Sequence, residues 1–279
     1  MKIFKKRKPA SHKGDYGHVF VIAGSIGLTG AAYLASEAAL LTGSGLVTCA
    51  IPKSLNVIMA KKFTEVMTLP IEDKGRGYFP ASAFPKIKNF SEKTDAVAIG
   101  PGLSQEDEVK KLVKRLIQGL DKPITLDADG INCIAGEPQI LKRAKRPLII
   151  TPHPGEMSRL IRKSVGYIQK NRKRIAQDVA KKYGVTVVLK GMNTVVTSPD
   201  GRIYVNKTGN PGMASGGVGD VLTGVIASLI GQGFAAFDAA KCGVYLHGLA
   251  GDIAAKEKGE ASLRAQDVLS NIPKVIKLV

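Results

Sequence analysis

A glycine-rich segment that runs directly into a carboxylate is the part of the sequence best suited to chemistry. It spans residues 210–224 and includes Gly216, Gly217, Gly219 and Asp220. Apolar residues recur at helical spacing after Asp220, so we expect a loop that opens a helix. The free N–H groups of such a loop and the positive end of the helix dipole form an anion site, usually for phosphate. Asp220 beside this site could take the proton of a hydroxyl group that attacks phosphorus.

The same residues also allow a purely structural interpretation. Asp220 could cap the helix while the glycines only turn the chain. The number of glycines and the long helix of small residues that follows favour the anion site. The loop is not of the Walker type, because no Gly-Lys-Ser/Thr ends it.

The chain around this segment alternates between predicted strands and predicted helices. Strands are expected at 19–23, 46–51, 96–99, 124–126, 148–150 and 185–189, with a hairpin formed by 194–198 and 202–206. Helices are expected at 31–42, 108–119, 165–183, about 235–255 and 265–278. Residues 61–90 are less regular in pattern and could be an excursion from the sheet. The alternation predicts one domain over residues 1–279, an α/β/α sandwich of three layers with a mostly parallel sheet, preceded by a basic lead-in at 1–14.

Several predicted strands end in residues that are unusual at such positions. These ends are Gly100–Gly102, Asp127–Asp129, Thr151–Glu156 and Lys190–Gly191. In a parallel sheet the carboxyl ends of the strands meet at one edge, where ligands bind. We therefore expect these ends to line one cleft together with the glycine-rich segment. Asp127 and Asp129 could serve a metal ion or a ribose there, and the sequence does not choose between these roles.

The chain of 279 residues carries a formal net charge of +18. Much of the excess lies at residues 2–13 and 159–182. Such stretches allow a non-catalytic nucleic-acid-binding protein as an alternative, because phosphate backbones attract Lys and Arg. No pattern of aromatic and basic residues suited to base stacking accompanies the charge. We therefore expect small anionic molecules, and no nucleic acid, as partners.

The cysteines and the apolar runs point to a cellular compartment. The chain has three cysteines and no Cys-x-x-Cys pair, so neither disulfides nor a cysteine metal site is expected. The basic N-terminus is not followed by an apolar signal core, and no apolar run is long enough to span a bilayer. These features predict a cytoplasmic protein without membrane contact.

Motifs along the chain from about Ser11 resemble those of a known enzyme family. Gly-x-Gly-Asp at 217–220 resembles the signature of ribokinase-like kinases. The whole glycine-rich segment resembles the ADP/ATP-dependent NAD(P)H-hydrate dehydratases, a branch of that superfamily, as do Gly-Pro-Gly-Leu at 100–103, Leu-Asp-Ala-Asp at 126–129, Thr-Pro-His-Pro-Gly-Glu at 151–156 and Leu-Lys-Gly at 189–191. Two positions depart from the usual pattern: Val218 replaces Thr, Ser or Met, and Gly130 replaces Ala. Val218 should present only its backbone to the anion site, and Gly130 should alter the substrate pocket slightly.

The resemblance implies a ribokinase-like fold and the repair of a damaged cofactor. NADH or NADPH hydrated on the nicotinamide ring would be dehydrated with ADP or ATP as phosphoryl donor and with Mg²⁺. Asp220 would deprotonate the ring hydroxyl, which receives a phosphoryl group that then leaves as phosphate. The nearest alternative is a ribokinase-like kinase for a sugar, hydroxymethylpyrimidine or hydroxyethylthiazole. Family members are often tetramers, so the resemblance also implies a homo-oligomer.

The resemblance implies roles for particular residues of this chain. The hydrated cofactor would contact Ala31, Gly102, His153 and Asp220. The nucleotide would contact Lys190, Gly191, Met192, Asn193, Thr194, Gly216, Gly217 and Gly219. Glu156 would help to hold Mg²⁺ through water. Structural alternatives remain for three of these: a loop histidine at His153, a surface lysine at Lys190 and a helix-start carboxylate at Glu156.

Overall fold

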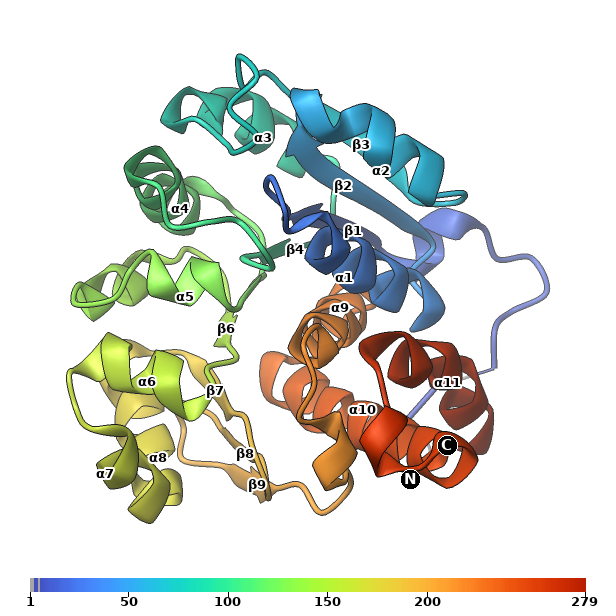
Figure 1. Ribbon diagram of the computed structural model, residues 1–279, viewed down its shortest axis with the longest axis vertical. Helices are drawn as coiled ribbons and strands as arrows, with labels where there is room; N and C mark the ends of the chain where they lie inside the picture. Colours follow the sequence, from blue (N-terminus) through green and yellow to red (C-terminus); the bar gives the residue numbers. More distant parts are fainter. Residues whose placement is uncertain (1–2, 5) are drawn as a thin grey trace.

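The computed structural model describes residues 3, 4 and 6–279, and its centre is one sheet of nine strands (Figure 1). The spatial order of the strands is β3-β2-β1-β4-β5-β6-β7-β8-β9. They are β1 (His18–Ile22), β2 (Leu46–Pro52), β3 (Met67–Ile71), β4 (Ala96–Ile99), β5 (Ile124–Leu126), β6 (Leu148–Ile150), β7 (Thr186–Leu189), β8 (Val195–Thr197) and β9 (Ile203–Val205). Strands β1 to β7 pair in parallel, and β8 and β9 close one edge in antiparallel pairing. The predicted mostly parallel sheet is confirmed.

Helices cover both faces of this sheet (Figure 1). One face carries α1 (Thr29–Leu41), α2 (Asn56–Lys62), α9 (Val218–Gly231), α10 (Ala236–Lys258) and α11 (Ala265–Leu278). The other carries α3 (Phe84–Ser91), α4 (Asp107–Gly119) and α8 (Arg172–Tyr183), with α5 (Asp129–Asn132), α6 (Pro154–Ile161) and α7 (Val165–Lys170) beside them. The three layers agree with the sequence prediction. Among the helices of the described residues, none is both long and apolar enough to cross a membrane.

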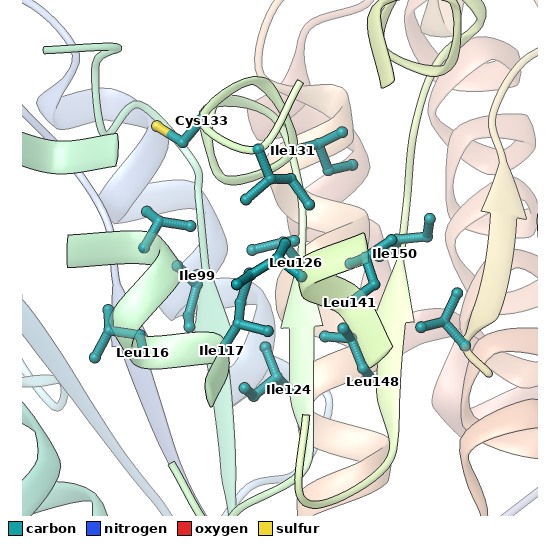
Figure 2. Packing of buried hydrophobic residues seen from close by; sticks show 14 of the residues in the cluster. Ile99, Leu116, Ile117, Ile124, Leu126, Ile131, Cys133, Leu141, Leu148 and Ile150 are labelled. Atoms are coloured by element: carbon teal, nitrogen blue, oxygen red, sulfur yellow. The ribbon is translucent and has the colours of Figure 1, made fainter. Parts of the chain in front are cut away.

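The alternation of side chains along the strands builds a core on each face. In β1, Val19 and Val21 face α1, whereas Phe20 and Ile22 join the core on the α4 side. Figure 2 shows part of the α4-side core, where Ile99 and Leu126 at the centre of the sheet pack with Leu116. Burying one such side chain contributes about 1.5–3 kcal/mol. The cysteines also lie in these cores, as the buried free thiols Cys49, Cys133 and Cys242.

Two stretches differ from the sequence prediction. Residues 61–90 are not an excursion, because Met67–Ile71 forms β3 and pairs in parallel with β2. Proline is tolerated on an edge strand, and the mostly half-exposed side chains of β3 hide the usual strand pattern. The helix expected at 165–183 is broken at Asn171, whose φ of −124° leaves the helical region. The break separates α7 from α8 and turns Arg172 toward the end of β7.

The lead-in at 1–14 is not simply a polar extension. Ile3 is buried, and its N–H donates to the carbonyl of Val279 at 3.0 Å. Arg7 lies 3.8 Å from the ring centroid of Tyr16, and it also donates to a backbone carbonyl of the α1–β2 turn. The predicted basic residues Lys2 and Lys5 lie outside the described residues. The N-terminal segment is therefore anchored at several points to the α/β/α body.

Candidate active site

The glycine-rich segment forms a loop that ends at the first turn of α9, as its sequence predicts. Gly217 is the N-cap of α9 with a φ of +88°, where a Cβ would lie 2.6 Å from the Leu34 side chain. Only glycine fits this conformation and this space without strain. The backbone N–H groups of Gly216, Gly217 and Gly219 make no hydrogen bond within the described part of the chain. Unpaired donors at a helix N-terminus have the geometry of the predicted anion site.

Two side chains of α10 hold this loop in place. They are Asp252 and the buried His247. Asp252 accepts hydrogen bonds from the Gly209 N–H at 3.0 Å and from the Asn210 amide at 3.1 Å. His247 Nε2 lies 2.9 Å from the carbonyl oxygen of Val218. Burial lowers the pKa of His247 to about 4, so the neutral ring donates from Nε2. Neither residue is marked by a motif, because their role depends on the packing of α10 under the loop.

Asp220 occupies the first turn of α9, directly beside the unpaired N–H groups. Burial is the largest cause that raises its pKa, and the carboxylate of Asp127 raises it further. Lys190 opposes this effect, and the resulting pKa of Asp220 is about 7. A carboxyl group with a pKa near the working pH is well suited to act as a general base.

A buried network links Asp220's helix to two other strand ends. Lys190 Nζ lies 2.5 Å from Asp127 Oδ1 and 3.6 Å from Glu156 Oε2. The Thr223 hydroxyl, one turn after Asp220, donates to Asp127 Oδ2 at 2.5 Å. Burial lowers the pKa of Lys190, but the two carboxylates outweigh it and raise the pKa above its ordinary value. Lys190 is thus a buried cation and not the surface lysine of the structural alternative.

His153 and Glu156 form a reciprocal cap at the start of α6. His153 Nδ1 accepts from the Gly155 N–H at 2.9 Å, and Glu156 Oε2 accepts from the His153 N–H at 2.7 Å. The imidazole Nε2 lies 3.3 Å from Glu156 Oε1, which places its proton on Nε2. Burial and the charge of Lys190 lower the pKa of His153, while burial raises that of Glu156. Glu156 therefore has the helix-start role of its structural alternative, and His153 is the N-cap of the same helix. The half-exposed ring of His153 still faces solvent.

Ala31 in the first turn of α1 and Gly102 in the loop after β4, the other predicted cofactor contacts, come together. A Cβ on Gly102 would lie 2.8 Å from the Leu28 carbonyl and 3.0 Å from the Ala31 Cβ. The Ser25 hydroxyl donates to the Gly102 carbonyl at 2.8 Å and fixes this contact. A recess of about 380 Å³ lies elsewhere, lined by residues of α6, α7 and α8, and it contains none of these residues. Converging polar groups therefore define the candidate site.

The predicted nucleotide residues 190–194 form the turn between β7 and β8. Met192 at the tip is 89% exposed, and Asn193 has a φ of +54°. The Thr194 hydroxyl donates to the Gly191 carbonyl at 2.8 Å. Arg172 donates to the carbonyls of Leu189 at 2.9 Å and Lys190 at 3.2 Å, which holds the base of the turn. The turn thus presents an exposed edge above the buried ammonium group of Lys190.

The two positions that depart from the family pattern both face protein. Val218 is buried in the core on the α10 side, so only its backbone belongs to the loop. A Cβ on Gly130 would lie 2.9 Å from the Ile99 carbonyl. Gly130 therefore faces the end of β4 and not a ligand pocket. Its neighbour Asp129 accepts from the Ser104 N–H at 3.0 Å and the Gln105 amide at 3.1 Å.

The residues of the site fit a Mg²⁺ ion that takes most of its ligands from water and nucleotide phosphates. No group of three or more His, Cys, Asp or Glu side chains in the described ranges is arranged to hold a metal directly. Glu156 and Asp127 nevertheless bring two buried carboxylates to one ammonium group. Mg²⁺ commonly keeps several waters and binds nucleotide phosphates with one or two carboxylates. Glu156 and Asp127 are the residues suited to such a water-mediated role.

Two single substitutions, one a control, test the buried network around Asp127. We expect Thr223→Val to lower the free energy of unfolding by about 1.5–3 kcal/mol, because a buried carboxylate loses a hydrogen bond. Thr125→Val is the matched control, since the Thr125 hydroxyl is buried without a partner among the described residues. Urea unfolding of both variants is the measurement. Equal effects of the two substitutions would contradict the importance of the Thr223–Asp127 bond.

Comparison with known proteins adds independent findings. The family model for NAD(P)H-hydrate dehydratase matches residues 19–274. An ADP-dependent (S)-NAD(P)H-hydrate dehydratase of Neisseria meningitidis is 37% identical over 93% of this chain and 84% of its own length. A bifunctional NAD(P)H-hydrate repair enzyme of Moorella thermoacetica is 44% identical over 98% of this chain and 51% of its own length. This chain thus spans about half the length of such bifunctional relatives.

A solved structure supports the same relationship. The ADP/ATP-dependent NAD(P)H-hydrate dehydratase of Bacillus subtilis, co-crystallised with ATP and Mg²⁺, is similar with a TM-score of 0.84 and 31% identity. The similarity covers 99% of this chain and 94% of that one. The ribokinase-like fold expected from the motifs is confirmed.

Proposed function

Because this chain belongs to the NAD(P)H-hydrate dehydratase family, we propose that it restores hydrated NADH and NADPH with ADP or ATP as phosphoryl donor. The observation that carries the proposal is the position of Asp220. Its carboxyl group, with a pKa of about 7, stands beside three unpaired backbone N–H groups. A base and an anion site side by side are what transfer of a phosphoryl group to a hydroxyl requires.

The proposed reaction has two steps. The ring hydroxyl gives its proton to Asp220, and its oxygen bonds to the terminal phosphorus of the nucleotide as the bond to the leaving nucleotide oxygen breaks. The ring nitrogen then donates its lone pair while the carbon–oxygen bond breaks and phosphate leaves. Loss of a proton from the neighbouring ring carbon restores the double bond. The sum is loss of water from the hydrated ring, coupled to hydrolysis of one phosphoanhydride bond.

The chain's own residues have distinct tasks in this proposal. The N–H groups of Gly216, Gly217 and Gly219 bind the transferred phosphoryl group, and the turn at 190–194 binds the nucleotide. Mg²⁺, when bound, neutralises phosphate charge, and Glu156 and Asp127 would hold it through water. The hydrated ring lies against Ala31, Gly102 and the exposed edge of His153.

Two further properties belong to the proposal. We propose a single functional domain over residues 1–279 that assembles as a homo-oligomer, with the tetramer suggested by the family as the first candidate. We also place it in the cytoplasm, where reduced thiols such as the three buried ones persist. Light scattering coupled to gel filtration measures the assembly.

One assay tests the proposed function. Hydrated NADH or NADPH is incubated with the protein, Mg²⁺ and either ADP or ATP, and the absorbance of the reduced nicotinamide is followed. We expect recovery of absorbance with one equivalent of phosphate released, and none without nucleotide or with a non-hydrolysable analogue. Dehydration that proceeds equally well without nucleotide would end the proposal. Transfer of phosphate to an added sugar or pyrimidine alcohol instead would assign the kinase alternative.

A further inference from the structure

Arg159 is a cation beside the candidate site that has no acidic partner in the part of the chain that the structure describes. It lies on α6, and its Nε donates to Asn132 Oδ1 at 2.9 Å. Helices α5 and α6 lie side by side, which brings these residues together (Figure 1). Within the described residues, Arg159 forms no ion pair with a carboxylate. Lys190, a second cation of the site, by contrast lies between the carboxylates of Asp127 and Glu156.

The orientation of the Arg159 guanidinium is set by a relay of hydrogen bonds. Asn132 Nδ2 donates to Asp129 Oδ1 at 3.3 Å, which turns its carbonyl oxygen toward Arg159. Asp129 is itself fixed by the Ser104 N–H and the Gln105 amide. The relay uses Nε of Arg159, and neither terminal nitrogen has a hydrogen-bond partner among residues 3, 4 and 6–279, so both can bind a ligand. A guanidinium with two free parallel donors matches a phosphate group.

Arg159 lies near His153, on the side of the site where we expect the hydrated cofactor. Its Nη1 lies 3.7 Å from the position of a Cβ on Gly155, in the first turn of α6. After burial and Lys190, its positive charge also helps to lower the pKa of His153, and it offsets part of the rise that burial causes in the pKa of Glu156. His153 is a proposed contact of the hydrated ring, so a dinucleotide that extends from this ring passes near α6. The nucleotide turn at 190–194 is held by a different cation, Arg172.

We propose that Arg159, oriented by Asn132 and Asp129, binds a phosphate group of the hydrated dinucleotide. The inference rests on the proposed function for the identity of the ligand. Two phosphate groups share this chemistry: the diphosphate that NADH and NADPH have in common, and the 2′-phosphate of NADPH alone. In this proposal Arg159 binds the substrate and takes no part in phosphoryl transfer.

Binding of intact NADH and NADPH to Arg159→Gln tests the inference. The dissociation constants are measured by the fluorescence of the reduced nicotinamide, which needs no turnover. We expect Kd to rise about 10- to 100-fold, the usual effect of losing a charged hydrogen bond to phosphate. A rise for both dinucleotides assigns the diphosphate, and a rise for NADPH alone assigns the 2′-phosphate. Arg159→Lys, which keeps the charge but not the two parallel donors, should recover binding only in part.

Arg162→Gln is the matched control, because Arg162 ends the same helix and its guanidinium lies against Gly136 instead. It removes the same charge and should leave both constants unchanged. Equal losses in the two variants would overturn the inference, since they would report only long-range charge. Wild-type affinity for both dinucleotides in Arg159→Gln, or a loss of ATP affinity alone, would also overturn it. Failure of the proposed function would appear separately, as NADPH binding that depends on Arg159 without any dehydration of the hydrated cofactor.

Discussion

Asp220→Asn should lower kcat by about 10²–10⁴-fold while nucleotide binding is retained, the range expected for loss of a general base. The amide has nearly the same size, and the Asp220 side chain makes no capping hydrogen bond to α9 among the described residues. The anion site consists of backbone N–H groups that the substitution does not remove. Nucleotide affinity should stay the same or increase, because a negative charge near the phosphates is lost. Turnover and nucleotide Kd are measured on the folded variant. A kcat within about threefold of wild type would remove Asp220 from the mechanism, because general-base catalysis is worth far more.

The pH dependence of the same pair of proteins provides an internal check. The carboxylate is the active form of the base, so wild-type kcat/KM should rise as pH increases through about 7. Asp220→Asn should lose this rise.

The raised pKa of Asp220 also predicts how the free energy of unfolding changes with pH. Folded Asp220 keeps its proton up to about pH 7, whereas an unfolded Asp releases it near 3.8. Wild-type stability should therefore fall across this interval relative to Asp220→Asn, since the folded state binds more protons there.

Lys190→Met should have the largest effect on folding. It leaves Asp127, which is 1% exposed, and Glu156 without their cation. Breaking a buried ion pair in this way costs about 3–5 kcal/mol in the free energy of unfolding. It should also move the rise of the pH–rate profile above pH 7, because Lys190 lowers the pKa of Asp220. Urea unfolding and the pH profile of kcat/KM are the two measurements.

Two further variants distinguish the loss of stability in Lys190→Met from the general effect of replacing a lysine. Lys111→Met removes an exposed ion pair with Glu108 and should unfold like the wild type. Lys190→Met combined with Asp127→Asn should recover part of the lost stability, because the amide carries no charge that needs compensation. Equal stability of Lys190→Met and Lys111→Met would show that the buried network contributes nothing.

The sequence by itself determined the layered fold and the principal loop. Buried strands such as Ala96–Ile99 and Leu148–Ile150 are short apolar runs bounded by turn residues, and their limits agree with the structure. The glycine-rich loop and the position of Asp220 on its helix were predictable because they depend on neighbours in the chain. Local patterns failed where tertiary contacts decide, as at β3, whose edge position tolerates Pro70 and leaves side chains half exposed.

Only the tertiary structure decided which polar residues act together. Asp127 contacts Lys190, which is 63 positions away, and Thr223, which is 96 positions away. His247 and Arg159 likewise reach their partners through helix packing that no local spacing encodes. The raised pKa of Asp220 has the same origin, because its burial and the proximity of the Asp127 carboxylate exist only in the folded chain. Residue types and short spacings specify which chemical groups are present, whereas desolvation and long-range charge set how strongly each group holds its proton.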